Sequence, residues 1–173
     1  DLGDSYFFKK PALEVIMEKL PATVELVLGA TFIIVTLSVP IGVYCAIRPR
    51  SWLTRLLMGL SIVGISIPVF LTAILLIYVF SINLGWFPSY GRGDTVMVGF
   101  WETGLLTKDG LIHLILPSIA LSSIMLPLFI RLIRSEMMEC LEQDYIRFAR
   151  AKGLSNKRIW FLHALQNTLL PVI

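Results

Sequence analysis

The sequence predicts an all-α integral membrane protein, a polytopic bundle of helices, and three observations lead to this class. Hydrophobic residues make up 56% of the chain and charged residues only 16%. The mean hydropathy is +0.79, which is far above that of an ordinary soluble domain. The charges are also segregated, because residues 26–47, 56–91 and 110–130 contain no Asp, Glu, Lys or Arg. Each of these runs reaches the roughly 20 residues that a helix needs to cross a bilayer.

The charge-free runs place the membrane spans. Residues 1–20 are polar and mixed, begin without Met and lack a signal-peptide pattern, so the chain looks like a fragment. Residues 81–110 form a long outer loop, since Gly85 and Pro88 break the second half of the middle run. Together, residues 21–173 form one membrane domain. The expected spans cover residues 21–47, 56–80, 111–133 and the start of another from about 164.

Several positions within these spans allow two interpretations. Ser38, Gly42 and Ala46 recur every four residues, a spacing that lets another helix approach closely. They could line a translocation path, or they could serve ordinary packing of the bundle. Pro68 predicts a break that is either a gate hinge or a static kink. Glu25 lies near the outer end of the first span and could reach the membrane surface or a wet cavity, and we expect the first, a carboxylate that reaches the membrane surface.

Pro21 and Pro40 bear on the first span. Proline is favoured in the first turn of a helix, so Pro21 is expected to open the span. Pro40 lies well inside it and should kink the helix or weaken its hydrogen bonds.

A basic, helix-forming segment, residues 139–171, separates the last two apolar runs. Asp144 is a candidate N-cap for about two helical turns. Gly153 follows those turns and is placed to end them in the left-handed conformation that glycine adopts freely. A helix this short is marginal on its own in water, so we expect it to dock on another surface.

The spacing within this helix predicts two faces. Tyr145, Phe148 and Ala149 lie at i, i+3 and i+4 and are expected to share an apolar face. Arg147 and Arg150 are three residues apart and are expected to share a basic face.

The letters DYIRFARAKGLS at 144–155, with HALQN at 163–167 and LP at 170–171, resemble the coupling loop of the membrane-spanning subunits of ATP-binding-cassette importers. The more specific resemblance is to the B-type permease of the oligopeptide, dipeptide and nickel branch, which reads much like DYIRTARAKGL…RHALRNALLPV. The resemblance implies a bundle of the type I importer permease kind with a cytoplasmic coupling helix. It also implies that residues 1–20 are an extracytoplasmic segment that follows a missing first helix. Phe148 stands where that branch usually has a small Thr.

The resemblance implies a set of functional residues and partners. His163, Asn167 and Pro171 would support the coupling loop. The partners would be a second, C-type permease subunit, two ATP-binding subunits and an extracytoplasmic substrate-binding protein, all assembled at the lipid bilayer. The cargo would be a peptide or a related small solute. The residues that would contact the ATPase are Asp144, Tyr145, Arg147, Phe148, Ala149, Arg150, Ala151, Lys152, Gly153 and Leu154.

The distribution of basic residues predicts the orientation. Most Lys and Arg side chains lie in or around residues 48–55 and 134–163, and the remainder lie in the other connections among acidic residues. The positive-inside rule therefore places these two segments in the cytoplasm and residues 81–110 outside. The expected location is the inner, or plasma, membrane with several crossings.

Several activities lack their signatures in this sequence. There is no G-x-x-x-x-G-K-[ST] phosphate loop, so we expect no cofactor on this chain and ATP with Mg²⁺ on the partner subunits. No arrangement suggests catalysis, a metal site or nucleic-acid binding, and the chain is expected not to be an enzyme. Two alternatives stay open, a secondary transporter or channel module and a membrane assembly protein without transport. The first usually carries ionisable residues at the middle of a span.

Overall fold

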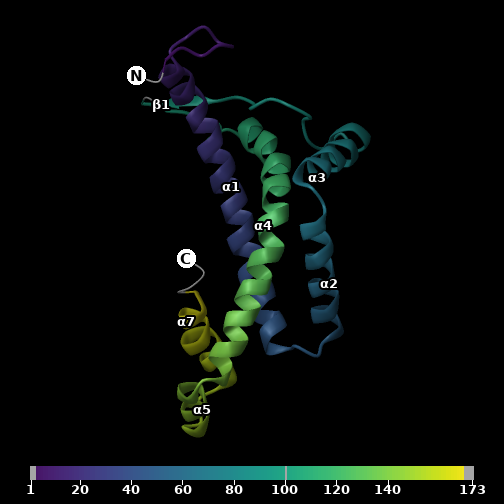
Figure 1. Cartoon of the computed structure of the whole chain (residues 1–173), viewed down its shortest axis with the longest axis vertical. Helices are drawn as coiled ribbons and strands as arrows, with labels where there is room; N and C mark the ends of the chain where they lie inside the picture. The colour runs from purple at the N-terminus through teal and green to yellow at the C-terminus, as the bar shows by residue number, and fades with distance from the viewer. Residues whose placement is uncertain (1–2, 100, 170–173) are drawn as a thin grey trace. The chain divides into compact units, whose positions relative to one another are not determined.

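The structure is a computed structural model that describes residues 3–99 and 101–169. Contacts divide the chain into two compact units. Unit 1 combines residues 1–32 with residues 69–121, and unit 2 combines residues 33–68 with residues 122–173. Two long helices, α1 (Ala12–Ile47) and α4 (Lys108–Glu142), run through both units (Figure 1). The predicted helical class is confirmed.

Helices α1 and α4 are both long and apolar enough to cross a membrane. Each extends beyond the span that the sequence predicts, because the polar residues at 12–20 and 134–142 continue the helix outside the apolar run. Pro21 was therefore placed wrongly in a first turn, since α1 begins at Ala12. The helix also continues through Pro40.

The middle apolar run is broken, as predicted, at Ile67 and Pro68. It forms α2 (Trp52–Ser66), α3 (Val69–Leu76) and the π-helix η1 (Ile77–Asn83). These pieces make a third candidate span if they are counted together. The Ser66 hydroxyl donates to the carbonyl of Ile62 at 3.0 Å and so stays within its own helix.

A short antiparallel hairpin lies inside the predicted outer loop. Strand β1 (Val96–Val98) pairs with β2 (Trp101–Thr103), with Met97 opposite Glu102. The sequence analysis did not predict these strands. Helix α4 starts at Lys108, so the loop also ends earlier than residue 110.

Unit 2 contains the main hydrophobic core. Helix α4 is followed by α5 (Asp144–Ala151), α6 (Asn156–Arg158), the π-helix η2 (Ile159–Ala164) and α7 (Leu165–Leu169). Fully buried side chains from α4, α5 and η2 meet there, including Ile133, Met137, Ile146 and Ile159. Residues 134–169 are thereby packed onto the ends of α1 and α4 as one structure.

Gly42 marks a close approach of α1 to α4 within unit 2. A Cβ atom at this position would lie 2.8 Å from Cβ and Cγ2 of Ile133 and 3.1 Å from the carbonyl oxygen of Ile130. Ser38 and Ala46 are buried on the same helix. These contacts within one chain favour the packing interpretation of the small-residue spacing.

We expect Gly42→Ala to destabilise the protein by about 1–3 kcal/mol, because overpacking forces neighbouring side chains and backbone to shift. Gly59→Ala is the matched control, since a Cβ at Gly59 meets nothing within 4 Å. The control should be neutral or slightly stabilising, as alanine is the better helix former. Thermal unfolding of the purified proteins in detergent measures both, and equal midpoints would contradict the close packing.

Candidate functional site

Helix α5 begins one residue earlier than the sequence predicts, at the residue that was expected to cap it. Asp144 is its first residue, and Gln143 has the extended backbone of an N-cap (φ −66°, ψ 150°) without a side-chain capping bond. Asp144 was therefore assigned wrongly as the cap. Its carboxylate instead lies in the first turn, where a negative charge interacts favourably with the positive end of the helix dipole.

The end of α5 is closed by Gly153, as predicted. Gly153 has φ +76°, and its N–H donates to the carbonyl of Arg150 at 2.9 Å. The N–H of Leu154 donates to the carbonyl of Ala149 at 3.2 Å. This pair of hydrogen bonds is a Schellman motif, which satisfies the last carbonyls of the helix and turns the chain sharply.

The buried face of α5 differs from the predicted one. Ile146 is 0% exposed and Ala149 is also buried, and both belong to the core of unit 2. Tyr145 is 42% exposed and Phe148 is 62% exposed. Ala149 was therefore grouped wrongly with these two aromatics, because positions 146 and 149 form the inward stripe of the helix. Leu154 also packs partly against the core.

The outward side of α5 carries aromatic rings and cations. Lys152 places its Nζ 4.5 Å from the centre of the Phe148 ring, a cation–π contact. Arg147 lies 3.4 Å from the carboxylate of Asp144, but both side chains are exposed, so this pair adds little stability. Arg150, Ala151 and Gly153 are exposed as well. This side presents a basic, partly apolar surface.

Tyr145 connects α5 to its neighbours through its hydroxyl. Asn167 of α7 donates its side-chain N–H to that oxygen at 2.9 Å, and the Sγ of Cys140 in α4 lies 2.6 Å from it. Cys140 can in turn donate to the carbonyl of Ala164 at 3.5 Å. Burial raises the pKa of the Tyr145 hydroxyl, and the contact with Cys140 acts in the same direction. The group therefore stays neutral and keeps its proton for the hydrogen bond.

The structure gives less support to the other two residues that were predicted to hold the coupling loop, His163 and Pro171. His163 is half-buried in η2, and no hydrogen bond joins its ring to the residues that the structure describes. Pro171 lies outside the described residues.

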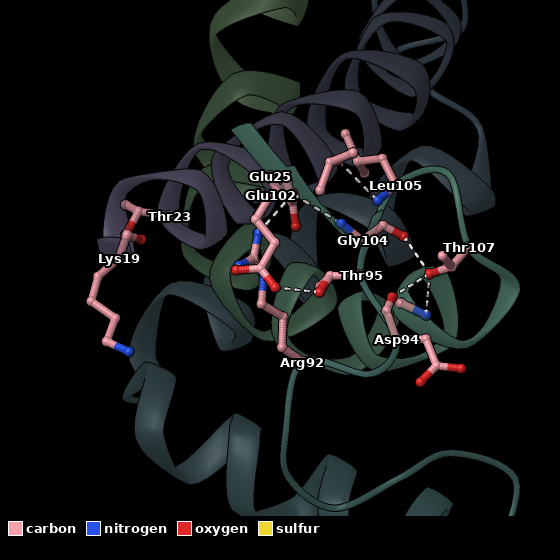
Figure 2. Close-up of polar contacts among 12 residues, drawn as sticks. Lys19, Thr23, Glu25, Arg92, Asp94, Thr95, Glu102, Gly104, Leu105 and Thr107 are labelled. Carbon is pink, nitrogen blue, oxygen red and sulfur yellow. Dashed lines mark hydrogen bonds and ion pairs between the residues drawn. The ribbon is translucent and has the colours of Figure 1, made fainter. Parts of the chain in front are cut away.

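Unit 1 holds a buried ion pair that the sequence analysis missed. Glu25 of α1 is only 4% exposed. Its Oε1 accepts a hydrogen bond from Nη2 of Arg92 at 3.0 Å and another from the backbone N–H of Gly104 at 3.1 Å (Figure 2). The prediction of a carboxylate that reaches the membrane surface is therefore wrong. A buried carboxylate requires such partners, because an unpaired charge is costly to bury.

Further polar contacts extend from this pair into the outer loop. Nη2 of Arg92 donates to the carbonyl of Glu102 at 2.6 Å, and the Thr95 hydroxyl donates to the Glu102 carboxylate. The Thr107 hydroxyl lies 2.5 Å from the carbonyl oxygen of Asp94 (Figure 2). Glu25 thus anchors the loop and the β1–β2 hairpin to α1. No local sequence signal shows this pairing, because 67 residues separate Glu25 from Arg92.

The comparisons with known proteins agree with the predicted resemblance. The family described as "Binding-protein-dependent transport system inner membrane component" matches residues 38–173. The chain belongs to this family of inner membrane components. It is 41% identical over 174 residues to the oligopeptide transport system permease protein AppB of Bacillus subtilis, covering all of this chain and 53% of AppB. It is 37% identical over 185 residues to the dipeptide transport system permease protein DppB of Alkalihalophilus pseudofirmus, covering all of this chain and 56% of DppB.

The protein is an integral membrane protein, as its family and its two long apolar helices indicate. The region that matches the family includes nearly all of unit 2 and the whole of α5, whereas Glu25 precedes it. The chain spans about half the length of the curated relatives it matches. Within residues 3–99 and 101–169, no group of three or more His, Cys, Asp or Glu side chains could hold a metal ion.

Proposed function

We propose that this chain is a transmembrane permease subunit of a binding-protein-dependent ATP-binding-cassette importer that carries peptides or a related small solute. The family match and the peptide permeases among its relatives support this function. The observation that carries the proposal is the construction of α5. Its inner face is fixed in the core by Ile146 and Ala149, while Tyr145 and Phe148 are exposed on its outer side.

In this proposal α5 docks in a groove of a separate ATPase subunit. Phe148 and Tyr145 supply apolar contact, and Arg147, Arg150 and Lys152 pair with acidic groups at the rim of that groove. Exposed cations steer association, whereas buried aromatic rings account for most of the affinity at an interface.

Movement of the ATPase would then reach the membrane helices through contacts within unit 2. The Schellman motif fixes the end of α5, and Ile146 packs with Ile133 and Met137 of α4 in the same core. The hydrogen bond from Asn167 to Tyr145 attaches α5 to α7. Since these contacts join three helices, a pull on α5 would move α4 and α7 with it.

The proposed assembly places this chain in the inner membrane with residues 48–55 and 134–163 in the cytoplasm and residues 81–110 outside. A C-type permease would form the other half of the translocation path. Two ATP-binding subunits would bind ATP with Mg²⁺ and hydrolyse it, so this chain would have no catalytic role. A soluble binding protein would deliver the solute to the outer side.

A test of this function compares two exposed aromatic residues in the predicted cytoplasmic segments, Phe148 on α5 and Trp52 at the start of α2. We expect Phe148→Ala in the full-length protein to weaken binding of the ATPase subunits by about 1–3 kcal/mol, or roughly five- to hundredfold in affinity. Fewer ATPase subunits should therefore co-purify with this variant. Trp52→Ala is the matched control and should retain them.

Purification of the tagged protein in mild detergent, followed by quantification of the partners and ATP-dependent peptide uptake in proteoliposomes, gives both readouts. If no ATPase co-purifies with the wild-type protein, the proposed function is wrong. Equal recovery from both variants would exclude α5 as the docking element.

A further inference from the structure

A groove in unit 2 is separate from the outward side of α5 and has no part in the proposed coupling. It has a volume of about 450 Å³ and lies between the last turns of α1 and the segment from α6 to α7. Val39, Val43 and Ile47 line one wall, and Trp160 and Phe161 line the other. Both walls of the groove are therefore mainly apolar.

Two cations lie at the end of this apolar groove. Arg48 directly follows α1, and Lys157 belongs to α6. No acidic residue lines the groove, and neither side chain forms a salt bridge with the residues that the structure describes. The guanidinium of Arg48 lies 5.9 Å from the centre of the Tyr44 ring, which holds it beside the groove. Among residues 3–99 and 101–169, the two positive charges therefore have no counterion.

The length of the apolar wall matches one leaflet of a bilayer. From Val39 to Arg48 the helix rises about 13 Å, at roughly 1.5 Å per residue. Half of a hydrocarbon core of roughly 30 Å is about 15 Å. Tyr44 and Trp160 are aromatic residues of the kind that lie at membrane interfaces. An acyl chain would fit along the wall when a headgroup lies at its basic end.

We propose that this groove binds one anionic phospholipid from the cytoplasmic leaflet. Its phosphate would lie between Arg48 and Lys157, and an acyl chain would lie against Val39, Val43 and Phe161. Basic sites between helices on the cytoplasmic side suit such headgroups, because the negative surface potential of that leaflet attracts Lys and Arg. The inference depends on the proposed orientation of the chain but not on the transported solute.

Charge and shape together favour this occupant over two others. A free phosphate would be held by the cations but would leave the apolar wall exposed to water. A further apolar helix would cover the wall but would leave Arg48 and Lys157 without a counterion. An anionic lipid satisfies both requirements in one molecule.

Native mass spectrometry of the full-length protein in its purified complex, with added phosphatidylglycerol, tests the proposal. The comparison lipid is phosphatidylcholine with the same acyl chains, since it lacks net charge. We expect preferential retention of phosphatidylglycerol by the wild-type complex. The variant Arg48→Gln with Lys157→Gln should lower that retention roughly 25-fold, because each basic residue contributes about fivefold near a membrane surface.

Arg50→Gln with Arg55→Gln is the matched control, since Arg50 lies in the same connection as Arg48, Arg55 lies in the first turn of α2, and neither lines the groove. Retention within about twofold of wild type is expected for this control. Equal retention in the groove variant and the wild type would overturn the proposal, and so would an equal loss in the control. Because the readout is lipid retention, a failure to transport peptides would leave this result unaffected.

A second measurement identifies what covers the groove. A phosphatidylglycerol with a photoreactive acyl chain is expected to label the peptides that contain Val43 or Phe161. Labelling elsewhere only would overturn the proposal. A cross-link from Phe161→Cys to another protein segment in place of lipid would also overturn it, because it would show that this segment occupies the groove.

Discussion

Replacing Glu25 by leucine is expected to destabilise the protein by about 3 kcal/mol, because the change removes the buried counterion of the half-buried Arg92. Only the exposed carboxylate of Glu102, 3.9 Å from the guanidinium, would then remain beside it. The backbone N–H of Gly104 would also lose its acceptor. The outer loop and its hairpin would then separate from α1. Thermal unfolding of the full-length protein in detergent should show a large fall in the transition midpoint.

Two further variants separate an effect of the pair from an effect of lost packing. Glu25→Leu combined with Arg92→Met should recover a large part of the lost stability, since an apolar replacement of both partners leaves no buried charge. Glu18→Leu serves as the matched control on the same helix, because Glu18 forms an exposed ion pair with Lys19 at 2.8 Å. Its effect should stay below about 1 kcal/mol. A double variant as unstable as the single variant would show that the charges do not form the anchor.

The sequence predicts well where the structure depends on local patterns. The long charge-free runs predict α1, α4 and the broken middle span because crossing a bilayer demands continuous apolar length. Pro68 ends α2 and Gly153 ends α5 because both effects arise from the backbone of a single residue. Such features need no knowledge of distant contacts.

The wrong predictions concern residues whose environment is set by tertiary contacts. Glu25 looks like a surface carboxylate until Arg92 and Gly104 approach it from the outer loop. Ala149 fits either of two stripes on α5, and only the core around Ile146 selects the inward one. The local sequence also does not predict the β1–β2 hairpin, because the short strands that flank Gly99 lack a strong alternating pattern of apolar and polar residues.

In the proposed importer, Gly153→Val is expected to give the largest functional effect, a loss of ATP-dependent peptide uptake of about tenfold or more with the subunit still present in the membrane. Gly153 has φ +76°, a conformation that costs any residue with a Cβ about 1 kcal/mol or more, and a β-branched residue still more. A Cβ at this position would meet nothing within 4 Å, so the cost comes from the backbone alone. The Schellman hydrogen bonds would weaken, and α5 would no longer be held at a fixed angle to the core.

A series of substitutions distinguishes this backbone effect from a steric one. Because asparagine tolerates the left-handed conformation better than alanine does, uptake should decrease from Gly153 through Asn and Ala to Val. The thermal midpoint should fall only slightly in the same series, since Gly153 is exposed and makes no core contact. ATP hydrolysis by the reconstituted complex should fall less than peptide uptake, which is the mark of uncoupling. If uptake follows side-chain volume instead, with Ala better than Asn, the left-handed turn is not what holds α5 in its coupling position.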